Sequence, residues 1–192
     1  MVELTSDISW EIPQCLVIAI CQIEQLLPSK GIYRVNGNAL DVQLMKQQMD
    51  NNDFKAIQKC QSVNTIASMV KLYIRELPQS LISKGLAMKI DDLLKVDAED
   101  KHNKVANLIK SETTYDNMKI LKYLLEHLNR ITKESECKMN AKNLGICFSS
   151  NIIHVQMTKR RKQDSMLREA GSFNLVIEWL IKEIKHLNLN SD

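Results

Sequence analysis

Glycine and proline are scarce in this chain of 192 residues, which contains only 5 glycines and 3 prolines. Tight turns draw heavily on these two residues, and a β-sandwich or an α/β fold of this length needs many such turns. Hydrophobic residues make up 44% of the chain and charged residues 26%, which is the usual range for a globular protein. The composition therefore predicts helices joined by short polar loops.

Long apolar runs are also absent. The longest, Cys15–Cys21, falls far short of the roughly 18 residues that a bilayer-spanning helix needs. The residues before it are acidic and include no basic residue, which is unlike a secretory signal. The five cysteines are scattered and form no CxxC pair, so neither a zinc site nor a disulfide framework is indicated. We expect a reducing, cytoplasmic setting, and the net charge of +3 is too small to imply a nucleic-acid partner.

Apolar residues recur at spacings of three and four along most of the chain, the pattern of amphipathic helices. We expect a single all-α domain, residues 1–192. The predicted helices are residues 12–27, 39–49, 62–77, 83–94, 98–110, 115–131, 140–148 and 166–187. Ser62 is expected to cap the third of these helices, and Pro78 to end it. The predicted core includes Leu16, Ile20, Ile23, Val70, Tyr73, Leu124, Leu128, Ile177 and Leu180.

The common signatures of a self-contained active site are missing. No GxxxxGK[ST] or GxGxxG loop is present to cradle a phosphate, and no GxSxG sequence is present to hold a nucleophilic serine. The four histidines are far apart and form no HxxxH pair. We therefore expect no metal site and no cofactor bound by this chain itself.

Three segments nevertheless invite a functional interpretation. The segment Gly31–Gly37 places Arg34 between two glycines, which permit positive φ and close backbone approach, so it can present a guanidinium outward; it can equally be an ordinary surface turn. Lys71 and Arg75 share one helix face, which suggests an anionic partner, support for another loop, or simply two snorkelling cations. The segment Met139–Asn151 is mostly apolar, and the amides of Asn143 and Asn151 within it need hydrogen-bond partners.

In these three segments the chain resembles the RhoGAP family, domains that activate Rho-family small GTPases. The family pattern reads GIYR-x-SG, then LLKLYLRELPEPLI, then N-x-M-x-x-x-NLAIVFGPNL. This chain reads GIYRVNG, MVKLYIRELPQSLI and KMNAKNLGICFSSNI, in the same order. Ile12-Pro13 and the segment from Asn117 to Leu128 match further parts of the family pattern, so the resemblance covers residues 12–187.

The resemblance implies an all-α domain of the RhoGAP type that acts in trans and has no active site of its own. The partner GTPase would hold GTP and magnesium, and Arg34 would be the arginine finger, with its backbone carbonyl helping to place the glutamine that orients water. The family pattern assigns Lys71 to partner contact, Arg75 to steadying the finger loop, Asn143 to the partner-facing surface and Ile146 to an apolar contact.

The chain departs from the family pattern at several positions. Ser149-Ser150 replaces the usual Gly-Pro, so we expect the loop after Phe148 to be shaped differently. Ser80 replaces a proline, and Asn36 replaces a serine in the finger loop. Gly145 stands where alanine is usual and should loosen its helix by up to about 1 kcal/mol.

Two other functions stay open. The same fold could bind a GTPase or another protein without accelerating hydrolysis. The basic run Lys159, Arg160, Arg161 and Lys162 could contact anionic lipid or nucleic acid, steer the domain toward an acidic GTPase, or be a solvated loop. We expect a Rho-family GTPase as the partner, no nucleic acid, and a cytoplasmic domain recruited to the membranes that anchor the GTPase.

Overall fold

The computed structural model describes residues 12–96, 99–154 and 163–190, with only the backbone for residues 163–166. Within these ranges the chain forms helices and turns and no β-strand. The helices are α1 (Gln14–Gln25), α2 (Ala39–Asp50), α3 (Lys55–Lys59), α4 (Val63–Arg75), α5 (Lys84–Lys95), α6 (Lys101–Glu112), α7 (Tyr115–Ile131), η1 (Ser135–Cys137), α8 (Ala141–Ile152), α9 (Gln163–Glu183) and η2 (Ile184–His186). The fold is therefore the all-α domain that the sequence predicts.

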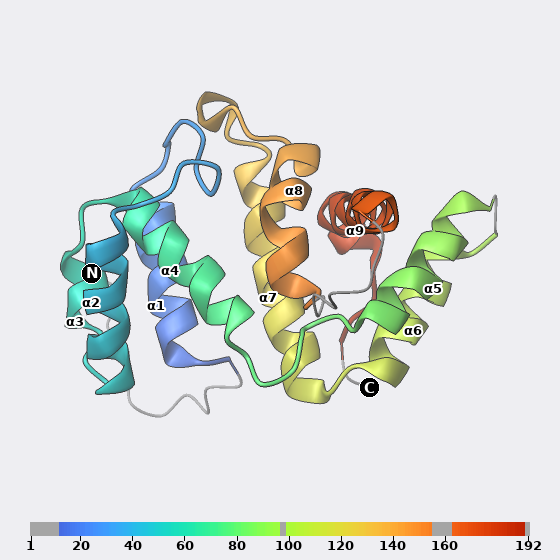
Figure 1. Ribbon diagram of the computed structural model, residues 1–192, viewed down its shortest axis with the longest axis horizontal. Coiled ribbons are helices and arrows are strands. Elements are labelled where there is room, and N and C mark those ends of the chain that lie inside the picture. The colour runs from blue at the N-terminus through green and yellow to red at the C-terminus, as the bar shows by residue number, and fades with distance from the viewer. Residues whose placement is uncertain (1–11, 97–98, 155–162, 191–192) are drawn as a thin grey trace.

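The central helices α7 and α8 separate two groups of helices (Figure 1). On one side lie α1 to α4, where α4 packs against α1, α2 and α8. On the other side α5 and α6 pair, and α9 packs along α8 and against α5. The loop between α1 and α2 and the short η1 lie at the same edge of the molecule (Figure 1), so segments about 100 residues apart meet there.

Polar side chains fix where several helices begin. Ser62 caps α4 as predicted, because its side chain accepts a hydrogen bond from the backbone N–H of Thr65. Ser83, Thr114 and Asn140 cap α5, α7 and α8 in the same way. These caps satisfy backbone donors that a helix leaves unpaired in its first turn. The sequence therefore sets the ends of the helices on which the candidate site is built.

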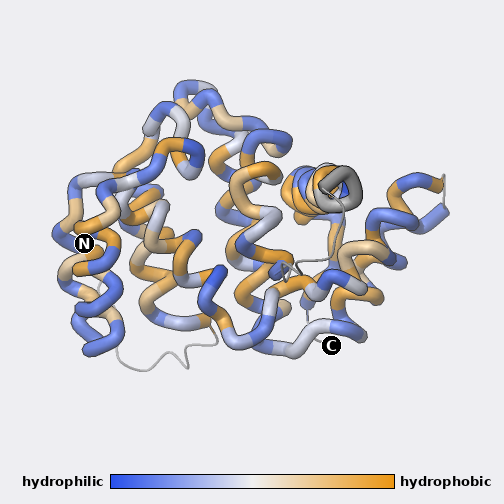
Figure 2. The backbone as a smooth tube through the Cα atoms, viewed as in Figure 1, coloured by the Kyte–Doolittle hydropathy of each residue, from blue (hydrophilic) through white to orange (hydrophobic). Residues whose placement is uncertain are grey.

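Hydrophobic stretches of α1, α4, α7 and α8 meet in the interior, whereas the outer edges of the molecule are more hydrophilic (Figure 2). The predicted core residues are at most 2% exposed, with the exception of Tyr73. Tyr73 is only half-buried against the core, so its assignment to the core was wrong. Its hydroxyl lies beside Cys15 at the edge of α1, and burial raises the pKa of Tyr73 to about 12. A tyrosine commonly buries its ring and keeps its polar end near the surface in this way.

Helix α8 contradicts the expected loop after Phe148. It continues through both serines to Ile152, and the Ser149 hydroxyl, which is buried, donates a hydrogen bond to the side chain of Asn174 on α9. A Gly-Pro pair would interrupt the helix here because proline lacks a backbone N–H and clashes with the preceding turn. Two serines keep the helical hydrogen bonds and allow α8 to extend.

Gly145 permits a close approach between α8 and α9. A Cβ atom at this position would lie 2.8 Å from the backbone oxygen of Asn174 and 3.1 Å from the backbone nitrogen of Glu178. Real Cβ atoms do not approach backbone so closely, so alanine would push the two helices apart. The low helix propensity of glycine is thus offset here by closer packing.

No helix in the described part of the chain is both long and apolar enough to cross a membrane. The basic run Lys159–Lys162 lies outside the described residues.

Candidate functional site

The segment Gly31–Gly37, called the Arg34 loop below, is closed on itself and tied to η1. The backbone N–H groups of Arg34 and Val35 both donate to the carbonyl of Gly31, at 3.0 Å each. The N–H of Gly31 donates across the molecule to the carbonyl of Cys137, at 2.8 Å. Gly31 adopts a φ of 77°, and a Cβ there would lie 3.2 Å from Val35. Glycine is therefore required for the turn that presents Arg34.

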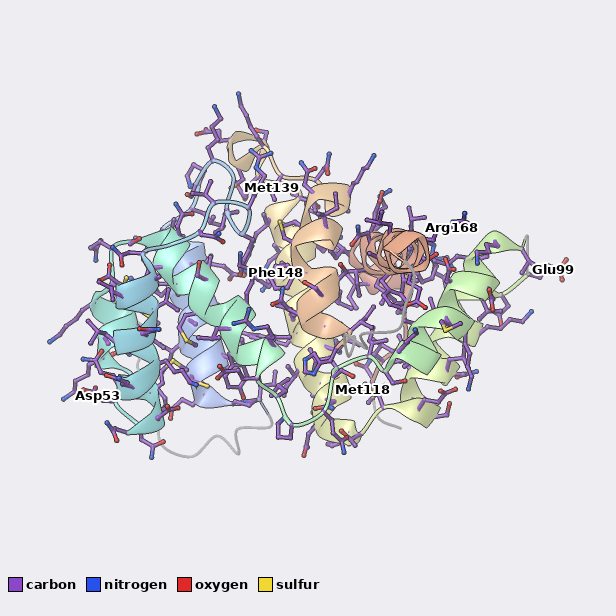
Figure 3. All side chains as sticks on the ribbon, in the orientation of Figure 1. Asp53, Glu99, Met118, Met139, Phe148 and Arg168 are labelled. Atoms are coloured by element: carbon purple, nitrogen blue, oxygen red, sulfur yellow. The ribbon has the colours of Figure 1, made fainter. Side chains whose placement is uncertain are left out.

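Tyr33, immediately before Arg34, anchors this loop in the core. Its side chain is only 1% exposed, its hydroxyl lies 2.7 Å from Nε2 of His127, and its ring meets the Phe148 ring edge-on with centroids 4.7 Å apart. Phe148 lies on the side of α8 that faces α4 (Figure 3). Tyr33 also adopts a φ of 67°, a left-handed conformation that is unusual for a residue with a side chain. Burial raises the pKa of Tyr33, so its hydroxyl stays neutral.

Behind Tyr33 a chain of hydrogen bonds reaches the surface. Nδ1 of His127 lies 2.7 Å from Oε1 of Glu24 on α1, and the same oxygen accepts from Nε and Nη2 of Arg130, at 2.9 and 2.7 Å. Burial lowers the pKa of His127, and hydrogen bonds from His127 and Arg130 lower that of Glu24. A neutral imidazole therefore donates from Nδ1 to the carboxylate and accepts at Nε2 from the hydroxyl of Tyr33.

Helix α4 holds the opposite side of the Arg34 loop. The ammonium of Lys71 donates to the backbone oxygen of Tyr33 at 2.8 Å and to Oδ1 of Asn36 at 3.3 Å. The N–H of Gly37 donates to Oγ of Ser68 at 2.9 Å, and a Cβ at Gly37 would lie 2.3 Å from Cα of Thr65. Burial lowers the pKa of Lys71 and the nearby charge of Arg75 lowers it further.

Arg34 is exposed on this hydrogen-bonded loop, and its guanidinium makes no hydrogen bond or ion pair with the described part of the chain. The guanidinium folds back over Gly31, where Nη2 lies 3.4 Å from the position that a Cβ would take. The side chain of Arg34 is therefore exposed, as the sequence of the Gly31–Gly37 segment predicts. A fixed backbone carries a side chain whose charge is left unneutralised within the domain.

The remaining predicted residues lie on the adjoining faces of α4 and α8. Arg75 is exposed one turn beyond Lys71, and the side chains of Arg75 and Asn143 make no hydrogen bond among the described residues. Ile146 is 53% exposed. Cys147, one turn after Asn143, lies within electrostatic reach of both Arg34 and Lys71, although burial dominates and raises its pKa. This surface of α8 therefore adjoins the Arg34 loop.

The comparison with known families decides the identity of the fold. The sequence model described as the RhoGAP domain matches residues 13–157 of this chain. The chain belongs to the RhoGAP domain family. The resemblance carried by the three motifs is thereby confirmed.

Curated relatives of this RhoGAP domain are much longer proteins. The chain is 28% identical over 189 residues to Rho GTPase-activating protein 35 of Rattus norvegicus, covering 95% of this chain and 12% of that protein. It is 32% identical over 197 residues to Rho GTPase-activating protein 45 of Mus musculus, covering 88% of this chain and 17% of that protein. The chain thus spans only a small part of these relatives.

Solved structures share the fold of this RhoGAP domain. The BH domain from Graf, the GTPase regulator associated with focal adhesion kinase, superposes with a TM-score of 0.73 at 22% identity, over 90% of this chain and 91% of that one. Human Rho GTPase activating protein 15 superposes with a TM-score of 0.75 at 20% identity, over 90% of this chain and 82% of that one. These likenesses confirm an all-α fold of the RhoGAP type.

Two features of the RhoGAP domain site were not predicted from the sequence. The roles of Tyr33 and His127 were not predicted, although both lie inside motifs that carry the family resemblance. Glu24 had no signal at all, because it is 103 positions from His127 and meets it only in the folded chain. Lys71, to which the family pattern assigns partner contact, contacts the Arg34 loop, while Arg75, to which it assigns loop support, has no hydrogen bond to that loop.

The described residues of the RhoGAP domain contain no group of three or more histidine, cysteine or acidic side chains placed to hold a metal ion. All five cysteines are free thiols.

Proposed function

We propose that this RhoGAP domain accelerates GTP hydrolysis by a Rho-family small GTPase, with Arg34 supplied in trans as an arginine finger. The observation that carries the proposal is the exposed, unpaired guanidinium of Arg34 on a loop whose flanking residues are fixed to α4, α7 and η1. Family membership and relatives named Rho GTPase-activating proteins support it. GTP and magnesium would be held by the GTPase, so this domain would need no cofactor of its own.

The chemistry of phosphoryl transfer explains why one side chain suffices. The transition state spreads negative charge over phosphate oxygens, and a planar guanidinium can hydrogen-bond to more than one of them. Arginine fingers contribute about 10³–10⁵ in rate in other GTPase systems, which corresponds to roughly 4–7 kcal/mol of activation free energy. A loop fixed before the partner arrives also avoids ordering cost in the complex. The backbone carbonyl of Arg34 would help to place the glutamine of the GTPase that orients water.

The contacts within the domain suggest how the supporting residues divide their roles. Lys71 uses two of its three N–H donors on the Arg34 loop, so we assign it loop support first and partner contact through the remaining donor. Arg75 and Asn143 have side chains without hydrogen-bond partners among the described residues, and Ile146 exposes apolar surface beside them. We assign these three residues to the surface that the GTPase contacts.

Single-turnover GTP hydrolysis by Rho-, Rac- and Cdc42-type GTPases, with and without saturating domain, tests the proposal. The wild-type domain should accelerate hydrolysis by at least one of them, and Arg34→Ala should lose nearly all of this stimulation. Arg168→Ala is the matched control, because Arg168 is an exposed arginine on α9, labelled in Figure 3, and should retain full stimulation. A wild-type domain that binds a loaded GTPase without accelerating hydrolysis would establish the non-catalytic alternative instead.

We also propose that the domain acts in the cytoplasm at membranes that anchor the GTPase. The five free thiols are in keeping with a reducing compartment. The run Lys159–Lys162 would strengthen membrane contact through anionic lipid headgroups. Cosedimentation with vesicles that contain phosphatidylserine should fall when these four residues are changed to glutamine, and unchanged cosedimentation would contradict the lipid contact.

A further inference from the structure

We propose that His127 is a positioning residue for the finger, which acts through Tyr33 to hold the backbone that directs Arg34. The inference rests on the proposed function, because positioning matters only if Arg34 reaches a GTPase. It adds a buried histidine, which never touches the partner, to the residues that determine the rate.

The backbone conformation of Tyr33 must be stabilised by contacts with other residues. A residue with a side chain at a φ of 67° is strained, and such conformations persist when the surroundings over-determine them. Three separate contacts hold Tyr33 in this conformation. Its hydroxyl is hydrogen-bonded to His127, its ring packs edge-on against Phe148, and its carbonyl accepts a hydrogen bond from Lys71. Arg34 is the next residue along the chain, so any relaxation of Tyr33 changes the direction of the finger.

The hydrogen bonds at His127 have a fixed direction. The carboxylate of Glu24 can only accept, and it is held by Arg130, so it requires the proton of the imidazole on Nδ1. Nε2 is then an acceptor, and it can accept from the hydroxyl of Tyr33, 2.7 Å away. Each group therefore orients the next, from the surface ion pair on α1 and α7 to the base of the Arg34 loop.

Glutamate, histidine and tyrosine in series also occur where a hydroxyl is activated as a nucleophile. That role does not fit here, because Tyr33 is 1% exposed and His127 is 0% exposed, so no substrate can reach the hydroxyl. Burial also raises the pKa of Tyr33 rather than lowering it, which opposes formation of a phenolate. The hydrogen-bonded series of Glu24, His127 and Tyr33 is therefore suited to stabilise the Arg34 loop and not to activate the Tyr33 hydroxyl as a nucleophile.

Loss of the Tyr33 hydroxyl should lower the stimulated rate of GTP hydrolysis without weakening the affinity for the GTPase. Partner contacts on α4 and α8 do not depend on the hydroxyl of Tyr33, so loss of this hydroxyl should leave docking largely intact. A finger displaced by a fraction of an ångström loses much of its effect, because phosphoryl transfer depends on precise placement. The maximal stimulated rate should therefore fall while the domain concentration for half-saturation hardly changes.

Single-turnover GTP hydrolysis over a range of domain concentrations tests this with Tyr33→Phe, which removes one oxygen and keeps the ring. We expect the maximal rate to fall about tenfold and half-saturation to change less than about twofold. Tyr73→Phe is the matched control, because Tyr73 on α4 is half-buried with its hydroxyl beside Cys15 of α1 and makes no hydrogen bond to the Arg34 loop; it should keep the wild-type rate. Equal maximal rates for wild type and Tyr33→Phe would overturn the inference alone, whereas a wild-type domain without stimulation would overturn the proposed function.

Two further measurements isolate the part played by His127. Glu24→Ala removes the acceptor for Nδ1 of His127 at the surface end of the series, spares the core, and should lower the maximal rate several-fold; a full rate in this variant would overturn the role of His127. A long-range proton–nitrogen NMR correlation of the wild-type imidazole should show the proton on Nδ1. This measurement needs no GTPase, and a proton on Nε2 would overturn the proposed orientation even if the domain were catalytically inactive.

Discussion

At the scale of single residues, the site combines one unrestrained side chain with a tightly restrained backbone. The guanidinium of Arg34 has no hydrogen-bond partner among the described residues, yet the residue before it is buried, hydrogen-bonded through its hydroxyl and its carbonyl, and packed against Phe148. A finger needs both properties, because the charge must be available to the partner and its position must not cost ordering free energy when the complex forms.

Arg34→Lys should be almost as inactive as Arg34→Ala in single-turnover hydrolysis, despite keeping the positive charge. The ammonium is a point charge without the planar fork that spans two phosphate oxygens. Because Arg34 is exposed, both variants should unfold in urea at the wild-type midpoint. A lysine variant with wild-type stimulation would show that charge alone is sufficient and would contradict the finger geometry.

His127 should make the free energy of unfolding depend on pH. Burial lowers its pKa below the ordinary 6.5 in the folded state, despite the opposing charge of Glu24, with Arg130 acting in the same direction as burial. The unfolded chain therefore takes up a proton as the pH falls through about 6.5 while the folded chain does not, so stability is lost with acidification below that pH. Urea unfolding between about pH 5.5 and 7.5 should show this slope in wild type and a shallower one in His127→Gln. Identical slopes would contradict a neutral buried His127.

At the scale of elements, α8 carries Asn143 and Ile146 of the candidate site and packs closely on α9. Its close approach to α9 depends on Gly145, and its final turn depends on the serines that stand where the family has Gly-Pro. Substitutions in α8 should therefore alter its packing against α9 as well as the candidate site.

Gly145→Ala should destabilise the domain by about 1–3 kcal/mol, although alanine favours helices more than glycine does. The new Cβ would lie 2.8 Å from the backbone oxygen of Asn174, so the helices must separate. Gly171→Ala on α9 is the matched control, because apart from the adjoining helix backbone no atom of the described residues lies within 4 Å of the new Cβ, and it should stabilise by about 0.5–1 kcal/mol. Urea denaturation gives the free energy of unfolding of both variants. Changes of the same sign in the two variants would contradict close packing at Gly145.

Lys71 and Arg75 should differ although they share one face of α4. Lys71→Ala removes two hydrogen bonds from the Arg34 loop and should lower both the maximal stimulated rate and the affinity for the GTPase. Arg75→Ala leaves the loop contacts intact and should weaken affinity with little change in the rate at saturation. A full maximal rate for Lys71→Ala in the single-turnover assay would show that the loop does not need this contact.

The elements also show how far sequence alone could reach. Helix α7 was predicted at its observed bounds, and the cap at Ser62 was correct, because periodicity and capping are local signals. The short α3 was not predicted, since five residues give too little periodicity to recognise. The link from Glu24 through His127 to Tyr33 joins three segments that only the tertiary fold brings together, so no local pattern could reveal it.

At the scale of the whole molecule, the fold supports one loop from several directions. The Arg34 loop connects α1 with α2, bonds to η1 through Gly31, rests on α4 through Lys71, and enters the core against α7 and α8 through Tyr33. The result is an all-α scaffold that holds the loop between α1 and α2 at one edge (Figure 1).

As an arginine finger, Arg34 would act on the transition state of a GTPase rather than on its ground state. The most direct test is binding of wild-type and Arg34→Ala domains to a Rho-family GTPase loaded either with GDP and aluminium fluoride, which mimics the transition state, or with a non-hydrolysable GTP analogue. We expect wild type to bind the aluminium fluoride complex far more tightly than the analogue complex, and Arg34→Ala to lose that preference while still binding the analogue. Equal preference for the aluminium fluoride complex in both domains would show that Arg34 does not act as an arginine finger.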